Sequence, residues 1–222
     1  MVSIGQQSRM KPLVRQSDAL EHTTTIARDV SAVLRPGDTI RLVGDLGAGK
    51  TTFVRALCAE LGVDPSEVSS PTFVLMHVHE RKNKAPIAHL DCYRLSDDDE
   101  LGALGTDDLI EQSAIFLIEW PDRAPDLADP ETSCTITIEH AGETSRVFTI
   151  APPPSWRDRP EYGALRTRGP AKCPATGAPV HPECPSWPFS SDQARMSDLH
   201  GWLTERYTIS RPIEQADLEQ GE

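Results

Sequence analysis

Apolar and polar residues follow two different periods along the first part of the chain. Between residues 17 and 34, apolar side chains recur at helical spacing, and Pro36-Gly37 follow. This pattern predicts an amphipathic helix that packs on a sheet. The apolar run at residues 39–43 predicts a short strand, and residues 53–61 return to helical spacing before Gly62.

Strand-like segments dominate the next part of the chain. The apolar run at residues 114–118 predicts a buried central strand, and an acidic helix is predicted before it, over residues 97–110. Polar turns around residues 82–84 and 140–143 predict two hairpins. The strands of these hairpins are predicted at residues 70–79, 87–93, 134–139 and 146–150. Residues 1–151 are therefore predicted to form one α/β sheet flanked by helices.

The composition changes abruptly after this region. Prolines, charges and glycines fill residues 152–170 without apolar periodicity, which predicts a linker. Residues 171–213 hold enough aromatic and apolar residues for a small core, and residues 214–222 form an acidic tail. The core of the small module is expected to use Trp187, Phe189, Leu199, Trp202, Leu203 and Tyr207.

Charge and cysteine usage limit the functions that are possible. The 222 residues carry a net charge of −12 with a pI near 5.0, which argues against a broad electrostatic grip on nucleic acid but allows a local basic face. No apolar run approaches the roughly 18 residues of a membrane span, and the first 20 residues lack the apolar region of a signal peptide, so we expect a cytoplasmic protein without membrane partners. The five cysteines form no paired C-x-x-C motif.

A phosphate-binding motif lies between the predicted strand 39–43 and the helix that follows it. Residues 44–52 read G-D-L-G-A-G-K-T-T and match G-x-x-x-x-G-K-[ST]. Glycines let consecutive backbone N–H groups curl around phosphate oxygens, and the helix N-terminus favours an anion. The sequence therefore predicts a P-loop NTPase sheet. The predicted nucleotide-binding residues are Asp45, Leu46, Gly47, Ala48, Gly49, Lys50, Thr51 and Thr52.

Three side chains of this region carry predicted chemical roles. Lys50 would reach the β and γ phosphates, and Thr51 would offer its hydroxyl to Mg²⁺. Glu119 follows the buried strand at its carboxyl end, where ligands bind in such sheets. It would hold Mg²⁺, directly or through water, or orient the attacking water. The alternative for Glu119 is a solvated strand-end carboxylate.

Four motifs in this order resemble the TsaE (YjeE) family. They are residues 44–52, Ser70-Pro71-Thr72-Phe73, the segment His89 to Leu95, and Ile118-Glu119-Trp120-Pro121. The resemblance covers roughly residues 12 to 150. It implies a bacterial ATPase that uses ATP and Mg²⁺ and is required for tRNA N6-threonylcarbamoyladenosine formation. It also implies binding to TsaB and TsaD, and contact with tRNA only through that complex.

The resemblance assigns roles to two further residues. Asp91 matches a family aspartate that is needed for activity, so it joins Lys50 and Glu119 as a predicted catalytic residue. A structural salt bridge with Arg94 is its alternative. Thr72 would face the γ-phosphate in a nucleotide-sensing loop, and its alternative is a strand-capping residue. From the residues themselves, Trp120 is predicted to pack at a strand end, with stacking on a partner as the alternative. The three histidines of this hairpin, His77, His79 and His89, are predicted to be partly exposed strand residues.

The choice of adenine follows from the family and from a missing motif. Asn83-Lys84-Ala85-Pro86 begins like the guanine-reading N-K-x-D motif but lacks the aspartate. The segment around residues 23–27 aligns loosely with the part of TsaE that flanks the base. Two functions remain as alternatives: a nucleotide-gated binding module without turnover, and a small-molecule P-loop kinase, although the arginines between residues 81 and 123 are too few for a typical lid.

The C-terminal module resembles YacG, a small zinc-ribbon family associated with inhibition of DNA gyrase. The resemblance rests on residues 172–180, 188–191 and 198–207. Its four ligand positions fall on Cys173, Thr176, Ser190 and Ala194, so a single thiol is left and zinc is not expected. A rewired site from Cys173, His181, Cys184 and His200 is an alternative. Gyrase binding does not follow from the degenerate motif and stays a secondary possibility.

Overall fold

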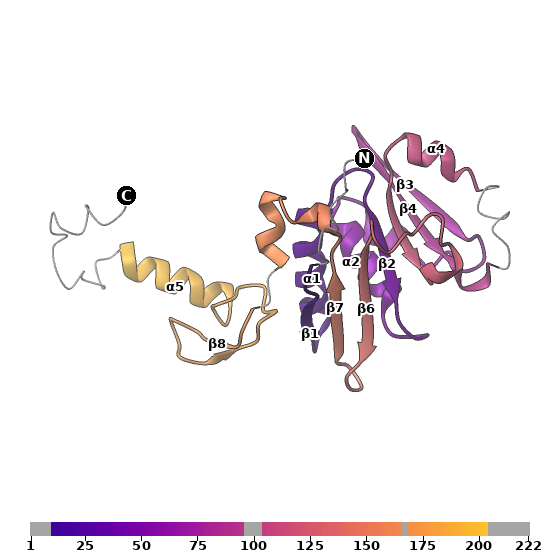
Figure 1. The fold of residues 1–222 in the computed structure, drawn as a ribbon. Helices are drawn as coiled ribbons and strands as arrows, with labels where there is room; N and C mark the ends of the chain where they lie inside the picture. Colours follow the sequence, from indigo (N-terminus) through magenta and orange to yellow (C-terminus); the bar gives the residue numbers. More distant parts are fainter. Residues whose placement is uncertain (1–9, 96–103, 166–167, 204–222) are drawn as a thin grey trace, which may run out of the picture. The chain divides into compact units, whose positions relative to one another are not determined.

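A computed structural model describes residues 10–95, 104–165 and 168–203 of the chain (Figure 1). The chain divides into two compact units, residues 1–168 and 169–222, and each is described by itself. Within the described residues, no helix is both long enough and apolar enough to cross a membrane.

The first unit is built on a mixed sheet. In the described residues its strand order is β1-β7-β6-β2-β5-β4-β3. The central strands β4, β5, β2 and β6 run parallel, whereas β1, β7 and β3 join antiparallel. The strands are β1 (Leu13–Ser17), β2 (Thr39–Val43), β3 (Met76–Arg81), β4 (Lys84–Asp91), β5 (Ile115–Glu119), β6 (Cys134–His140) and β7 (Arg146–Ala151).

Apolar cores cover both faces of the central strands. Helices α1 (Leu20–Val33) and α2 (Lys50–Glu60) pack against one face, and α4 (Thr106–Glu111) lies in the core of the other. Strand β5 shows why both layers exist. Its Leu117 belongs to the core under α1 and α2, whereas Phe116 belongs to the opposite core. An unbroken apolar run is thus buried on both sides, as expected of a central parallel strand.

The predicted α/β class and the P-loop sheet with flanking helices are confirmed, but the edges of several elements differ. The predicted helix over residues 17–34 begins at Leu20, and an edge strand that was not predicted, β1, precedes it. The sequence of β1 lacks a clear apolar–polar alternation because a charged residue, Arg15, occupies a buried position. Arg15 is 2% exposed and forms an ion pair with Asp29 at 2.9 Å. A buried charge is tolerated when it is paired and hydrogen-bonded.

The predicted strand over residues 70–79 is wrong in its first half. Residues 72–74 form a turn, in which the N–H of Leu75 donates to the carbonyl of Pro71 at 2.7 Å. Leu75 has a φ of 65°, so the chain cannot extend there, and β3 begins at Met76. The predicted acidic helix over residues 97–110 lies partly outside the described residues, and its described end is α4.

The predicted linker over residues 152–170 is also wrong over most of its length. Two 3₁₀ helices, η4 (Pro154–Trp156) and η5 (Pro160–Leu165), belong to the first unit, which extends to Arg168. The side chain of Trp156 is 1% exposed within the main core. Arg159 pairs with Asp38 before β2, and one of its nitrogens donates to the carboxylate at 2.9 Å. The prolines therefore bend the chain along the domain surface instead of separating two domains.

This contact predicts a large loss of stability for Trp156→Ala. Deleting a fully buried indole leaves a cavity and removes its apolar burial, so the free energy of unfolding should fall by about 3–5 kcal/mol. Urea unfolding measures the change. Trp187→Ala is a matched control because Trp187 is 37% exposed in the other unit. A loss below about 1 kcal/mol for Trp156→Ala would return residues 152–168 to the role of a linker.

The second unit is small. It contains a two-stranded sheet of β8 (Ala171–Lys172) and β9 (Pro179–Val180), followed by helix α5 (Asp192–Leu203). Its core holds Cys173, Val180 and Ala194, with Cys184 and Phe189 packed against them. The expected core is wrong for Trp187 and Leu199, which are 37% and 50% exposed, whereas Phe189 does contribute. Tyr207 and the predicted tail lie outside the described residues.

Candidate nucleotide-binding site

The glycine loop joins the carboxyl end of β2 to the N-terminus of α2. Gly47 and Gly49 have φ angles of 78° and 105°, a region that L residues with side chains rarely adopt. Gly49 is the N-cap of α2 and offers no side chain to the first amides of the helix. Those N–H groups are therefore directed toward an incoming anion, where the helix dipole adds to their attraction.

Lys50 is the first residue of α2, and its side chain turns back onto the glycine loop. Its Nζ donates to the carbonyls of Gly44 at 2.7 Å and Asp45 at 2.9 Å, and it lies 3.9 Å from the ring centre of Trp120. Burial lowers the pKa of Lys50, and the nearby carboxylates of Glu119, Asp91 and Asp45 oppose that shift. The ammonium is held among acceptors and one aromatic face, at the base of the helix N-terminus.

Glu119 ends β5 beside the first turn of α2. Its Oε1 accepts a hydrogen bond from Thr51 Oγ1 at 2.7 Å, and it lies 3.0 Å from Nε2 of His89. Glu119 is 3% exposed and His89 is fully buried. Parallel pairing of β4 with β5 sets Asp91 opposite Glu119 and His89 opposite Leu117. The alternative of a solvated glutamate is therefore excluded, and the side chains of Thr51 and His89 both reach Glu119 at the carboxyl end of β5.

Asp91 ties the turn after α2 to the sheet. Its Oδ2 accepts hydrogen bonds from Ser70 Oγ at 2.7 Å and Thr72 Oγ1 at 2.6 Å. Its other oxygen accepts the N–H of Tyr93 at 3.1 Å. Among the ion pairs of the described residues, none joins Asp91 to Arg94, whose guanidinium lies 5.3 Å from the ring of Phe73 instead. The salt-bridge alternative is therefore not the arrangement found.

Two cavities flank the glycine loop and share Gly49 and Thr52. The first, of about 220 Å³, is lined by Leu46, Gly47, Gly49, Lys50, Thr51, Thr52, Ser70, Thr72, Asp91, Glu119 and Trp120. The second, of about 180 Å³, is lined by Ser17, Ala19, Leu20, Thr23, Ala48, Gly49, Thr52, Thr144, Arg146 and Phe148. Of the predicted site residues, Asp45 lines neither cavity and contributes its carbonyl to Lys50 instead.

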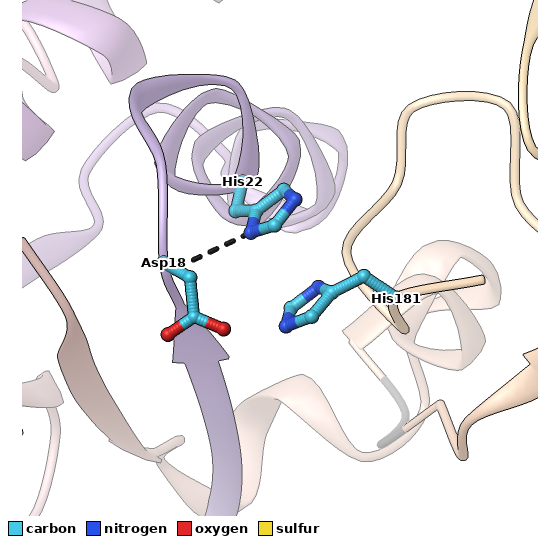
Figure 2. A group of neighbouring side chains, drawn as sticks. All are labelled: Asp18, His22 and His181. Carbon is cyan, nitrogen blue, oxygen red and sulfur yellow. Dashed lines mark hydrogen bonds between the residues drawn. The ribbon is translucent and has the colours of Figure 1, made fainter. Parts of the chain in front are cut away.

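The second cavity depends on how the chain enters α1. The N–H of Asp18 donates to Nδ1 of His22 at 3.2 Å, which closes the turn before the helix (Figure 2). Ser17 and Thr23 hydroxyls lie 2.7 Å apart on the same side, and both residues line the cavity. Arg146 is fixed on the loop because its Nε donates to the carbonyl of Ala48 at 3.0 Å. This cavity has hydroxyl groups, an aromatic ring and a guanidinium along its wall.

Sequence reasoning missed part of the site. His89 was predicted to be partly exposed, and it is instead fully buried against Glu119. Ser70, to which no role was assigned, shares the carboxylate of Asp91 with Thr72. Trp120 packs on Tyr93 at 5.0 Å and on Lys50, in line with its predicted packing at a strand end. The signal for His89 was its spacing of two residues from Asp91, which puts both side chains on one face of β4.

The fold and the site define a P-loop nucleotide-binding protein. A glycine loop lies between a parallel strand and a helix, and the next strand, β5, brings a carboxylate to the first helical turn. Residues 17–148 match the family described as "Threonylcarbamoyl adenosine biosynthesis protein TsaE". Because this match covers more than half of the 222 residues, the chain belongs to the TsaE family.

Individual relatives agree with this assignment. The tRNA threonylcarbamoyladenosine biosynthesis protein TsaE of Bacillus subtilis is 35% identical over 141 residues, which are 64% of this chain and 86% of the relative. The protein of the same name from Aquifex aeolicus is 37% identical over 64% of this chain and 96% of the relative. The crystal structure of YdiB from Bacillus subtilis superposes with a TM-score of 0.52 at 28% identity, covering 67% of this chain and 92% of that one.

Proposed function

We propose that this chain binds ATP with Mg²⁺ at the P-loop and hydrolyses it to drive the enzymes that modify tRNA. As a member of the TsaE family, the chain acts in tRNA threonylcarbamoyladenosine biosynthesis. The observation that carries the proposal is the contact of 2.7 Å between Thr51 and Glu119, beside the helix N-terminus and Lys50. These groups are the phosphate-binding and cation-binding parts of a P-loop ATPase.

The donor set fits Mg²⁺. This cation prefers oxygen ligands, usually one or two protein groups together with phosphates and water. Thr51 and Glu119 would hold it, and they supply one hydroxyl and one carboxylate from adjoining elements. When bound, Mg²⁺ neutralises charge on the β and γ phosphates.

Other residues would bind the phosphates, orient the attacking water and hold the nucleoside. Lys50 would exchange its two carbonyl partners for phosphate oxygens, and the amides of residues 45–52 would surround the same phosphates. Glu119 would orient the attacking water, and Asp91 would set the position of Thr72 through their contact of 2.6 Å. The second cavity would take the nucleoside, because Thr23 and Phe148 provide polar and apolar wall on the far side of the loop.

Exposed apolar side chains around the phosphate cavity support a protein partner. Leu46 on the glycine loop is 79% exposed, and Phe73 beside Thr72 is 87% exposed. Large apolar side chains exposed beside a binding site are candidate contacts for a protein partner. We propose that this rim contacts TsaD and TsaB, that tRNA is reached only through that complex, and that the chain works in the cytoplasm. Hydrolysis would then change the turn that holds Phe73 through Asp91 and Thr72.

A phosphate-release assay tests the proposal. The purified chain is assayed alone and with TsaB–TsaD, and we expect Mg²⁺-dependent release of phosphate that rises with the partners. ATP binding without any release, even beside the partners, would instead support a nucleotide-gated module. Transfer of phosphate to an added metabolite, and not to water, would support a small-molecule kinase.

A further inference from the structure

We propose that His89 is a positioning residue for the P-loop chemistry, fixing the carboxylate of Glu119 for its cation role. His89 lies inside β4 and is fully buried, and its Nε2 lies 3.0 Å from Glu119 Oε1. The inference rests on the proposed function, because it concerns how Glu119 is oriented for Mg²⁺ and water. No role in substrate contact is assigned to His89.

The hydrogen bonds at Glu119 converge on one oxygen. Oε1 accepts from Thr51 and faces Nε2 of His89, and among the described residues no hydrogen bond joins Oε2 to a protein donor. An ionised Glu119 requires the Nε2–H tautomer of His89 for this contact. Two donors on Oε1 fix the rotation of the carboxylate, so the second oxygen has a defined direction at the cavity that Glu119 lines.

The histidine is held at a structural cost. With Nε2 committed to Glu119, its Nδ1 is buried and has no hydrogen-bond partner among the described residues. Leaving a buried acceptor unsatisfied costs its desolvation, which no hydrogen bond compensates. An apolar residue at this position of β4 would avoid that cost and would suit the neighbouring buried Leu90 and Ala88. A histidine with one unsatisfied ring nitrogen is rare in a core. We attribute its presence here to the contact of Nε2 with Glu119, which orients that carboxylate.

Residues that hydrogen-bond a metal ligand without touching the metal affect mainly metal affinity and activity. Their loss typically costs about 10–100-fold in metal affinity or activity, while groups that bind the rest of the ligand stay in place. We therefore expect His89→Leu to raise the Mg²⁺ concentration for half-maximal activity by about tenfold and to lower kcat by about tenfold or more. ATP affinity measured in EDTA should change less than about twofold, because Lys50 and the loop amides remain.

The experiment compares three variants of the full chain. His89→Leu removes the donor, His89→Gln keeps an N–H donor in its place, and His77→Leu changes the cross-strand neighbour that has no role at the phosphate site. Phosphate release is measured against Mg²⁺, and calorimetry measures ATP binding with and without Mg²⁺. We expect His89→Gln to recover most of the Mg²⁺ dependence and His77→Leu to match the wild type.

The outcomes separate this inference from the proposed function. Wild-type Mg²⁺ dependence in His89→Leu, or equal damage in His89→Gln and His89→Leu, overturns the positioning role alone. Calorimetry reports the Mg²⁺ effect on binding even if turnover is slow. If the wild-type chain binds no ATP, the proposed function fails and this inference fails with it.

A separate observation carries a second inference, on the C-terminal unit. We infer that the four ligand positions of a zinc ribbon still lie close together in this unit, but that the side chains now at those positions do not bind zinc. Cys173 and Ala194 lie in one small core, and the hydroxyls of Thr176 and Ser190 lie 3.5 Å apart. Both hydroxyl residues also hydrogen-bond the thiol of Cys173. The C-x-x-T and S-x-x-x-A positions thus meet at one point, as paired zinc ligands do.

The groups at that point differ from zinc ligands. One thiol, two hydroxyls and one methyl replace the four Cys or His ligands of a structural zinc site. The rewired alternative is absent, because within the described part of this unit no three His, Cys, Asp or Glu ligand atoms lie within 4.8 Å of one another.

Restoring the ligands tests both parts of this inference. Metal analysis of the wild-type full chain should find no stoichiometric zinc, and chelator should leave its unfolding midpoint unchanged. The triple variant Thr176→Cys, Ser190→Cys, Ala194→Cys should bind about one Zn²⁺ or Co²⁺ per chain. A control with cysteines one position away, at Ala175, Ser191 and Gln193, should not. Stoichiometric zinc in the wild type, or no metal in the triple variant, overturns the inference.

Discussion

Replacing Lys50 with alanine should lower kcat/KM for ATP hydrolysis by about a hundredfold to a thousandfold. A positioned donor that stabilises developing charge in a water-poor site has an effect of this size. Lys50 is 5% exposed and is the group with a full positive charge on the phosphate-cavity wall, where Thr51 and the amides are neutral. Its loss removes the cationic side chain that would offset the γ-phosphate charge opposite Glu119 and Asp91.

A phosphate-release assay at saturating Mg²⁺ measures this effect. Lys84→Ala is the matched control, because Lys84 is an exposed lysine at the start of β4, away from the cavity. The control should retain wild-type turnover. Turnover of Lys50→Ala within about threefold of the wild type would show that phosphate is bound elsewhere in the chain.

Gly44→Ala should both destabilise the first unit and abolish nucleotide binding. Gly44 has a φ of 153°, and a Cβ placed on it would lie 2.4 Å from the carbonyl oxygen of Ile138 on β6. Backbone atoms on a neighbouring strand cannot rotate away, so the loop must move. We expect a loss of about 3 kcal/mol or more in the free energy of unfolding. The Gly44 carbonyl that positions Lys50 would move as well.

Gly47→Ala isolates the steric part of this prediction. Gly47 also has a positive φ, of 78°, but a Cβ there meets nothing within 4 Å. It should lose only about 1–2 kcal/mol for the backbone conformation. Urea unfolding and ATP titration of both variants give the comparison. Equal losses in the two variants would contradict the close approach of the loop to β6.

The sequence was sufficient for the parts of the site that are local in the chain. The glycine loop, Lys50 and Thr51 occupy consecutive residues, so their geometry follows from one turn and one helix start. Glu119 was also predictable, because a buried apolar run places its last residue at the carboxyl edge of a parallel sheet.

The missed features depend on residues far apart in the chain. The burial of His89 requires strands on both sides of β4, and its alternation with Asp91 alone is also typical of a half-exposed strand. The strand β1 contains a buried arginine that an ion pair with the distant Asp29 stabilises. Residues 152–165 read as a linker because one tryptophan, one leucine and ion pairs replace apolar periodicity.

The contact between Thr51 and Glu119 was predicted as a shared cation site, and its role stays a prediction. The structure brings the two oxygens to 2.7 Å and sets Asp91 beside them. Sequence alone could not set the direction of the Glu119 carboxylate, because His89 and Thr51 reach it from different elements.

Calorimetric titration of the full chain with ATP, in the presence and absence of Mg²⁺, tests the central claim most directly. We predict heat of binding with one ATP per chain, tighter binding when Mg²⁺ is present, and loss of the signal in Lys50→Ala. An absence of binding heat at millimolar ATP and Mg²⁺, in a chain that is folded by urea unfolding, would contradict the account.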